Sequence, residues 1–354
     1  MQINAPFIEE YVCFKDIIYS IYKNFILIFG CNKKIFFIDH DYSCLVSDHM
    51  RKEFFMGSFV NSLLLYRAFK GFFDSLPSIE EYTIVYPFEN QPWEKGLLKA
   101  AREQTKKINL FAYQFFPLAR NLALHSFSKY AKKTNMIPDK ILTSDINTNN
   151  IFVEQGTETV LIGSGRFGNL VETSMRLKKR DKNKILCCLF LDPQEAFTLT
   201  YKAIEISRNL GCLLVINYHA LLSKKIISEI KTIVEKYQHV SVVEAVASEL
   251  LEDIFVVLYN SSSVCFEAAL RGVPVLYVAC ENLLNLDRFN GLSKGIAHIK
   301  EGVFFIRSLI ENEELYENYS YDIYTAAKNI ILPLNFTRMR EALQKPFLLI
   351  NNGG

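Results

Sequence analysis

Uninterrupted apolar runs, rather than alternating ones, dominate the second half of the chain. From residue 184 the sequence reads KILCCLFLD, then a stretch of helical spacing that ends before Gly211, then CLLVINYH. The same alternation continues through LLSKKIISEIKTIVEKY, VSVVEA, SELLED, IFVVLYN, SSVCFEAALRG and VPVLYVA, read in turn as helix, strand, short helix, strand, helix and strand. Strands that are apolar throughout are typical of a parallel sheet covered by helices on both faces. The pattern predicts a doubly wound α/β domain, which binds ligands beyond the carboxyl ends of its strands.

The first half of the chain is less regular but of a similar type. We predict strands over NFILIFG (24–30), KIFFIDH (34–40), YTIVYPF (82–88), INLFAYQF (108–115) and KILTSD (140–145), with helices over residues 52–74 and 93–104. Two α/β domains facing a cleft are therefore expected, over residues 1–180 and 181–330. The basic run RLKKRDKNK (176–184) marks their boundary, and the helical tail 331–354 is expected to pack back onto the first domain.

Composition narrows the class of protein. Of the 354 residues 50% are hydrophobic and 22% are charged, which is typical of a globular chain, and a net charge of +2 gives no reason to expect nucleic acid as a partner. The eight cysteines form no CxxC pair, which favours a reducing cytoplasm and argues against structural zinc. The N-terminus lacks the pattern of a secretory signal. The apolar stretch IIYSIYKNFILIFG is interrupted by Lys23 and Asn24 and is shorter than the roughly 20 residues of a bilayer span.

Two features of the charge and aromatic pattern leave alternatives open. The basic run at 176–184 is either a solvated loop or a patch that contacts anionic lipid or an anionic acceptor. The aromatic-rich first half either fills protein cores or includes a face that docks on a membrane. We therefore expect a cytoplasmic protein, with peripheral contact with the cytoplasmic face of the inner membrane left open.

A glycine motif at the domain boundary resembles the dinucleotide-binding fingerprint. Gly163, Gly165 and Gly168 spell GxGxxG. The preceding strand is short, basic residues interrupt the unit that should follow, and Asp192 lies farther on than the motif's spacing of about 20 residues. We interpret the motif as a glycine-rich turn and expect no bound cofactor.

Three consecutive serines stand where a strand passes into a helix, in YNSSSVCFEAALRG. The N–H and hydroxyl groups of Ser261, Ser262 and Ser263 could hold a phosphate at the helix N-terminus. The alternative is simple N-capping, although no Glu or Gln occupies the capping-box position. Glu267 lies one turn later on the same face, where a carboxylate could accept hydrogen bonds from a ribose.

The segment NSSSVCFEAALRGVPVLYV resembles the nucleotide-sugar motif of GT-B glycosyltransferases. The resemblance implies that the serines lie near the donor phosphate and that Glu267 meets the ribose. One strand–helix unit earlier, His219 matches the histidine of the Lys-x-His-Pro sequence in related enzymes of bacterial surface polysaccharide synthesis. Asn217 and Ala220 replace the lysine and the proline.

The first half contains a second match. The segment YPFENQPWEKGLLKAARE, followed by INLFAYQFF, resembles a family of surface carbohydrate biosynthesis proteins, with Phe115 where that family's histidine is expected. The matching residues are Glu89, Asn90, Gln91, Trp93, Glu94 and Gln114.

These matches provide candidates for catalysis and substrate contact. Glu89 follows a strand and precedes a helix, so it could act as the general base toward an acceptor hydroxyl, or it could merely satisfy backbone donors. The candidate substrate contacts are Asn90, Gln91, Gln114, Arg166 and His40. Arg166 would meet a carboxylate of the donor, and His40 is a weaker candidate for the base.

The resemblance implies a metal-independent GT-B glycosyltransferase for surface polysaccharide. The serine-capped helix would stabilise the leaving phosphate in place of a metal, so no metal is expected. The donor would be a nucleotide sugar, with CMP-activated ulosonic acids such as Kdo or sialic-type sugars favoured, and the acceptor a glycan or lipid-linked glycan. Two alternatives stay open: a nonhydrolysing UDP-sugar 2-epimerase, and a two-lobed binding protein without catalysis.

Overall fold

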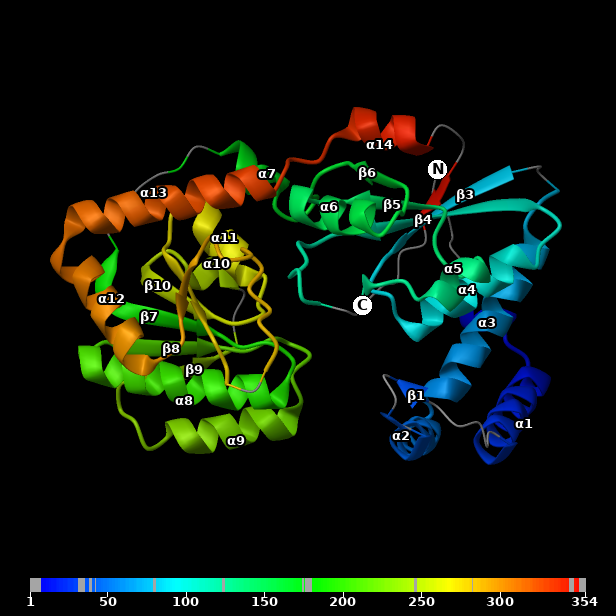
Figure 1. Ribbon diagram of the computed structural model, residues 1–354, viewed down its shortest axis with the longest axis horizontal. Helices are drawn as coiled ribbons and strands as arrows, with labels where there is room; N and C mark the ends of the chain where they lie inside the picture. Colours follow the sequence, from blue (N-terminus) through cyan, green and yellow to red (C-terminus); the bar gives the residue numbers. More distant parts are fainter. Residues whose placement is uncertain are drawn as a thin grey trace.

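Two parallel β-sheets form the centres of two domains, which lie side by side along the long axis of the molecule (Figure 1). The computed structural model describes residues 8–30, 36–37, 40–41, 43–78, 81–122, 125–173, 175, 180–244, 247–281, 283–343 and 347–349.

The second domain is built on a six-stranded sheet in the order β12-β11-β10-β7-β8-β9, with parallel pairing throughout. Its strands are β7 (Asp181–Cys188), β8 (Leu213–Asn217), β9 (Val240–Val243), β10 (Ile254–Tyr259), β11 (Val275–Val278) and β12 (Lys294–Ile296). Its helices are α7 (Gly168–Glu172), α8 (Pro193–Leu210), α9 (Lys224–Val234), α10 (Ala247–Leu250), α11 (Val264–Leu270), α12 (Ile299–Glu311) and α13 (Glu313–Ile330). The strand order reverses between β7 and β10, and such a switch point is where doubly wound sheets bind ligands.

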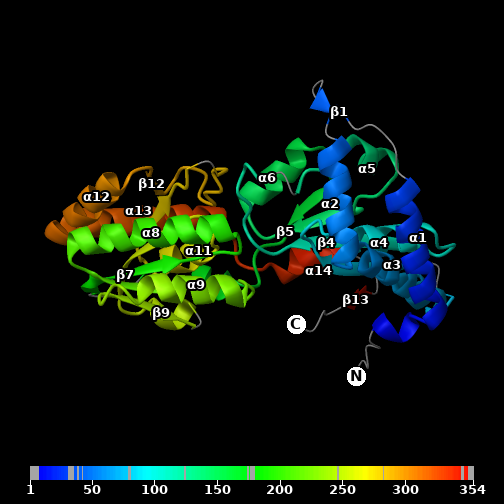
Figure 2. The ribbon, with the colours of Figure 1, turned by 90° about the horizontal axis from the view of Figure 1, so that it is seen from below.

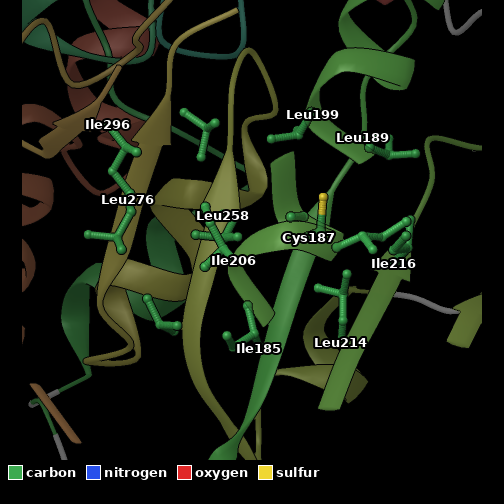
Figure 3. Close-up of a cluster of buried hydrophobic side chains, with 14 of the residues drawn as sticks. Ile185, Cys187, Leu189, Leu199, Ile206, Leu214, Ile216, Leu258, Leu276 and Ile296 are labelled. Atoms are coloured by element: carbon green, nitrogen blue, oxygen red, sulfur yellow. The ribbon is translucent and has the colours of Figure 1, made fainter. Parts of the chain in front are cut away.

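Both faces of this sheet are covered, as the uninterrupted apolar runs predict. Ile185 and Cys187 of β7 pack into the core beneath α8, α9 and α12, which Figure 3 shows in close-up. Leu186 and Cys188 of the same strand point to the opposite face and pack beneath α11 and α13. Successive strand residues alternate between faces, so two buried faces require an apolar residue at every position. The predicted helix end is also confirmed, because Gly211 follows α8 with a φ of 69°.

The first domain has a five-stranded parallel sheet in the order β13-β3-β4-β5-β6. Its strands are β3 (Glu81–Pro87), β4 (Lys107–Gln114), β5 (Lys140–Thr143), β6 (Thr159–Leu161) and β13 (Phe347–Leu349). Its helices are η1 (Ile8–Tyr11), α1 (Phe14–Gly30), α2 (Ser43–Phe55), α3 (Ser58–Ser75), α4 (Pro92–Arg102), α5 (Lys129–Lys133), α6 (Ile146–Glu154) and α14 (Phe336–Leu343). The main core lies between one sheet face and α3, α4 and α6, and α14 packs on the other face.

The predicted strand over residues 24–30 is wrong, because these residues form the last turns of α1. A short apolar run does not by itself distinguish a strand from part of a helix. The polar residues Asp16, Ser20 and Asn24 recur every fourth position and are buried, which is the spacing of one helix face.

Two other predictions for the first half need correction. The described part of residues 34–40 does not join the parallel sheet: β1 (Phe36–Phe37) and β2 (His40–Asp41) pair with each other in antiparallel fashion. The predicted single helix over 52–74 is two helices, α2 and α3. Gly57, with a φ of 80°, precedes α3 and breaks the continuity.

The C-terminal tail returns to the first domain. After α13 the chain forms backbone bridges from Ile331 to Asp145 and from Pro333 to Ser164, and α14 then packs against Phe111 and Leu142 (Figure 1). The strand β13 at its end, which pairs with β3, was not predicted.

The returning tail explains the glycine motif. A Cβ at Gly163 would lie 2.0 Å from the Pro333 carbonyl oxygen, and the φ of Gly163 is +87°. A Cβ at Gly168 would lie 3.4 Å from the Leu334 nitrogen. Gly163 therefore gives the returning backbone room at the domain boundary, whereas a Cβ at Gly168 would make an ordinary contact.

Residues 180–184, the described part of the basic run, belong to the second domain rather than to a solvated loop. Arg180 donates hydrogen bonds to the carbonyl oxygens of Leu251, Glu252 and Arg271, and Asp181 begins β7. Residues 176–179 lie outside the described residues. The preceding α7 contributes Val171 to the core of the second domain, while the predicted division at residue 180 stays a prediction.

Seven cysteines fall within the described residues and all seven are free thiols, five of them buried. Among the helices that the structure describes, none is both long and apolar enough to cross a membrane.

Candidate functional site

The carboxyl edges of the two sheets face each other across the domain boundary. The loop after β4 contacts the loop after β11: the Arg120 N–H donates to Asn290 Oδ1 at 3.0 Å and Asn121 Nδ2 donates to the Asn285 carbonyl at 3.1 Å. Because parallel strands end at the same edge of a sheet, these contacts bring the ligand-binding edges of both domains together.

A buried arginine joins the two edges. Arg288 donates through Nη1 to the Pro117 carbonyl of the first domain at 2.6 Å, and through Nε to the Ser261 carbonyl of the second at 2.5 Å. Its guanidinium lies 5.2 Å from the ring of Phe116 and 5.7 Å from the ring of Phe190. The sequence contains no motif around Arg288 that could have identified it, because both of its acceptors are backbone carbonyls far away along the chain.

Two of the three predicted serines, Ser261 and Ser262, are buried. Ser261 is 3% exposed and Ser262 is 5% exposed. The Ser261 hydroxyl donates to the Glu195 carboxylate, 2.8 Å from Oε1 and 2.6 Å from Oε2, and the Ser261 N–H lies 3.3 Å from Oε1. The Ser262 hydroxyl accepts from the N–H of Val264, the first residue of α11, at 3.4 Å.

Glu195 is a buried carboxylate that the sequence reasoning missed. It lies in the first turn of α8, where its N–H donates to Oδ1 of the N-cap residue Asp192 at 2.8 Å. Burial raises the pKa of Glu195, and the bonds from Ser261 oppose that rise. The Asp-Pro-x-Glu sequence at a helix start is the only local signal for it.

The third serine, Ser263, contacts one other predicted residue, Arg166. Ser263 is half-buried, makes no side-chain capping bond, and its hydroxyl accepts from Arg166 Nη1 at 3.1 Å. Burial, and then the charge of Arg166, lower the pKa of His219, so that imidazole lies within electrostatic range of the guanidinium. The structure thus brings together residues from the turn before α7, the end of β8 and the start of α11.

The proton position on His219 follows from its surroundings. Its Nδ1 accepts a hydrogen bond from the Leu221 N–H at 3.2 Å, which assigns the proton of the neutral ring to Nε2. The Phe190 ring packs against the imidazole with a centroid distance of 5.4 Å. Because the pKa is lowered, His219 is a neutral N–H donor at pH 7.

Glu267 lies in α11 and is half-buried. Its Oε1 accepts from Arg271 Nη2 at 3.4 Å, one helical turn away. The predicted contact with a ribose stays a prediction.

The first-domain edge contains the loop that joins β3 to α4. The N–H groups of Glu89 and Gln91 both donate to Glu94 Oε1, at 2.8 and 2.9 Å, and Asn90 between them has a φ of 55°. Glu94 therefore satisfies the backbone donors of the loop, while the half-buried side chain of Glu89 does not have this role.

Glu94 is itself fully buried, and burial raises its pKa to about 7. Its Oε2 has no hydrogen-bond partner within the described part of the chain. The neighbouring Trp93 packs against Phe69 and Tyr86, with ring centroids 6.3 and 6.0 Å apart, so the side chain contributes to the core.

The two remaining candidates for substrate contact in the first domain are Gln114 and His40, and they lie in different parts of the domain. Gln114 is completely buried at the end of β4 and donates through Nε2 to the Phe116 carbonyl at 3.2 Å, so it supports the loop that holds Arg288. His40 lies in β2, shortly before α2 begins at Ser43, and its side chain is outside the described part of the structure.

Asp145, at the end of the predicted KILTSD strand, is a further buried carboxylate at this edge. It caps α6 by accepting from the Thr148 N–H at 2.8 Å and accepts from the Ser144 hydroxyl at 3.0 Å. Burial raises its pKa to about 6, and the charge of Arg288 counteracts that rise. Within the described ranges, no three or more His, Cys, Asp or Glu side chains are grouped so that they could hold a metal ion.

No protein-family model matches this sequence, and no curated protein matches it. Many solved structures do resemble the fold. A protein from Listeria monocytogenes assigned as a UDP-N-acetylglucosamine 2-epimerase superposes with a TM-score of 0.54 at 12% identity, covering 91% of this chain and 84% of that one. MnaA of S. aureus, solved with UDP, has a TM-score of 0.52 at 12% identity over 79% of this chain and 77% of that one.

A third structure, Anabaena Alr3699/HepE in complex with UDP, has a TM-score of 0.50 at 12% identity and covers 74% of this chain and 77% of that one. At such low identity the likeness concerns the fold. Together with the two parallel sheets joined at their carboxyl edges, it shows that this chain has the GT-B fold of two Rossmann-like domains.

Proposed function

We propose that this protein is a nucleotide-sugar-dependent glycosyltransferase whose donor phosphate binds at Arg166, His219 and Ser263. The observation that carries the proposal is the hydrogen bond from Arg166 to Ser263 at the start of α11, together with the effect of the Arg166 charge on the pKa of His219 at the end of β8. A guanidinium, an imidazole N–H and a hydroxyl are groups that bind phosphate oxygens.

Ser261 and Ser262 stabilise the loop that carries Ser263. Ser261 holds the buried carboxylate of Glu195, and Ser262 receives the first N–H of α11. Their buried hydroxyl groups keep the Ser263 end of the loop in place, and Glu267 on α11 is our candidate for the ribose contact.

In the reaction, Glu89 accepts the proton of an acceptor hydroxyl, whose oxygen forms a bond to the anomeric carbon of the donor sugar. The bond from that carbon to the phosphate oxygen breaks. Arg166, His219 and Ser263 stabilise the negative charge that develops on the departing nucleotide. Asn90 and Gln91, whose loop Glu94 holds, are the candidate contacts of the acceptor.

The nucleotide is proposed to carry a pyrimidine base. The sequence resemblance favours CMP-activated ulosonic acids, and two structural neighbours, MnaA and HepE, were solved with UDP. We propose a surface polysaccharide or a lipid-linked glycan as the acceptor, on the resemblance alone.

The decisive experiment measures nucleotide binding and turnover in matched variants. A thermal-shift panel of CMP, CDP, UDP, GDP and NAD identifies the base. Arg166→Gln and Ser263→Ala should each weaken binding of the preferred nucleotide about tenfold, because each removes one phosphate donor. Arg208→Gln, an exposed arginine on α8 paired with Glu205, is the matched control and should bind normally.

Glu89→Gln separates an enzyme from a binding protein. It should retain nucleotide binding and lose transfer of radiolabelled sugar, because only the proton acceptor is removed. If no donor releases its nucleotide and Glu89→Gln changes nothing, the protein binds nucleotide sugars without catalysis. If Arg166→Gln and Arg208→Gln bind the nucleotide equally well, the proposed phosphate site is wrong.

A 2-epimerase is the second candidate, and the extent of the superposition with the Listeria protein favours it. Such a reaction requires acids and bases around the sugar, and Glu89, Glu94 and Asp145 provide carboxyl groups at the first-domain edge. Incubation with UDP-N-acetylglucosamine in deuterated water distinguishes the two. Deuterium at C2 of the recovered sugar, without acceptor, would establish epimerisation.

A further inference from the structure

Helix α1 has its polar and apolar sides reversed relative to an ordinary surface helix. Asp16, Ser20 and Asn24 face inward and are 6%, 0% and 5% exposed. The large apolar side chains of α1 that are at least 38% exposed are Phe14, Ile17, Ile18, Tyr19, Ile21, Tyr22, Phe25 and Ile26. Among the other described helices, none exposes more than two large apolar side chains.

The ion pair between Asp16 and Arg67 of α3 holds α1 in this orientation, and the further bonds lie within α1 and at its start. Asp16 Oδ1 accepts from Arg67 Nε of α3 at 2.7 Å, and Asp16 Oδ2 accepts from the N–H and the thiol of Cys13, each at 3.0 Å. Asn24 Nδ2 donates to the Ser20 carbonyl at 2.7 Å. Rotating the helix to bury its isoleucines would break the ion pair with α3, so the apolar face points outward because the polar face is anchored.

The outward residues form one surface. Ile18, Ile21, Tyr22 and Phe25 are separated by three or four positions, and side chains at that spacing lie along the same side of a helix. The helix lies on the outside of the first domain, against α3 and away from the second domain (Figures 1 and 2). Contiguous apolar surface of this kind is typical of a site that contacts a protein or a membrane.

The charges on α1 favour an anionic surface as the partner. The exposed charged residues of this helix are Lys15 and Lys23, and its single acid, Asp16, is buried and paired with Arg67. A second copy docked through the same face would bring lysines of equal sign toward one another. Lysines next to aromatic and aliphatic side chains are typical of helices that lie in the headgroup region of an anionic bilayer.

We propose that α1 docks this protein on the surface of a membrane that contains anionic lipid, with Ile18, Tyr22 and Phe25 inserted among the lipids and Lys15 and Lys23 at the headgroups. The helix lies parallel to the bilayer rather than across it, since no described helix is long and apolar enough to span one. The inference is independent of the proposed transferase activity.

Flotation with vesicles of equal parts phosphatidylglycerol and phosphatidylcholine tests the proposal on the full chain. The wild-type protein should float with these vesicles, and Ile18→Glu/Phe25→Glu should lower its partition coefficient by at least about tenfold, because two inserted apolar side chains are lost. Lys15→Gln and Lys23→Gln should each lower binding about fivefold, with a smaller effect on vesicles of phosphatidylcholine alone.

The matched control is Phe304→Glu on α12, which alters a side chain that is 76% exposed in the second domain and should not change flotation. Unfolding midpoints should be alike in all variants, since each altered side chain is exposed. The proposal is overturned if wild-type protein does not float, or if Ile18→Glu/Phe25→Glu floats as well as Phe304→Glu. It is also overturned if light scattering shows a dimer that only the α1 variant dissociates, which would identify a second copy as the partner.

Discussion

The two sheet edges that meet at the domain boundary differ in chemistry although both end parallel strands. The second-domain edge presents Arg166, His219 and Ser263, which are cationic or donor groups. The first-domain edge contains the carboxyl groups of Glu89 and Glu94, and burial raises the pKa of Glu94 to about 7.

Under the proposed function, the second-domain edge would bind the anion and the first-domain edge would accept the proton. Donors converge where α11 begins, at the switch point of the second sheet, whereas the acids lie at the β3–α4 loop of the first. Neither edge is complete without the other, and Arg288 joins them through one backbone carbonyl on each side. We expect loss of Arg288, which joins the two edges, to have a larger effect than a change at either edge.

Arg288→Ala should have the largest effect. It removes two hydrogen bonds from a charged donor and leaves two carbonyls without that partner, so the free energy of unfolding should fall by more than about 3 kcal/mol. Urea unfolding followed by circular dichroism measures it. Arg288→Lys keeps the charge but cannot reach both carbonyls, so an intermediate loss is expected. A loss below about 1 kcal/mol for the alanine variant would show that the two edges are held together by other contacts.

Glu94→Gln tests the buried acid of the first-domain edge. Because the pKa is raised from 4.5 to about 7, the folded protein holds the proton more tightly than the unfolded chain. Glu94 therefore stabilises the fold below pH 4.5, and this contribution is lost as the pH rises to 7. The glutamine variant should be more stable than wild type at pH 8, by up to about 3 kcal/mol, and equal to it at pH 4.

Unfolding free energies across this pH range provide the measurement for Glu94. The alanine variant is the control, because it removes the acceptor of the Glu89 and Gln91 N–H groups and should be less stable at every pH. Parallel pH profiles for wild type and Glu94→Gln would contradict the prediction.

Ser261→Ala should reduce stability and not nucleotide affinity. It removes the hydroxyl that donates to the buried carboxylate of Glu195, at a cost of about 2 kcal/mol. Thermal unfolding and nucleotide titration on the same preparation measure both effects. Unchanged stability together with weaker nucleotide binding would place the Ser261 hydroxyl on the phosphate instead.

His219→Ala should have the smallest effect. Loss of one neutral N–H donor should weaken nucleotide binding about tenfold, which is about 1.4 kcal/mol. Because the pKa of His219 is lowered, wild-type affinity should not gain a contribution from this residue between pH 7 and pH 6. A gain in wild-type affinity over that interval that His219→Ala abolishes would mean that the imidazolium binds instead.

The predictability of the fold differs between the two domains. In the second domain each strand is buried on both faces, so the apolar runs identify it with few alternatives. In α1 the buried stripe is polar, and the apolar run at residues 24–30, in which Phe25 and Ile26 are exposed, imitates a strand. Hydrophobic patterning assumes that apolar side chains face the core, and it fails where they do not.

The residues of the candidate site also differ in whether the sequence predicts them. The residues that local motifs identify, Ser263, His219, Glu89 and Arg166, all lie at strand ends or turns. Arg288, Glu195 and Asp145 had no comparable signal. Each of these three is buried in contact with residues far away in sequence or with ordinary capping groups, and no local pattern encodes such burial.

The sequence alone thus determined the doubly wound second domain, because apolar periodicity is a local property, while the anion-binding role of the loop at Ser263 stays a prediction. Only the tertiary structure decided which serine faces the boundary, which glycine admits the returning backbone and which arginine joins the two sheets. Those outcomes depend on distances between segments separated by as many as 171 residues. The free energy of burying a group depends on its neighbours in space rather than in the chain.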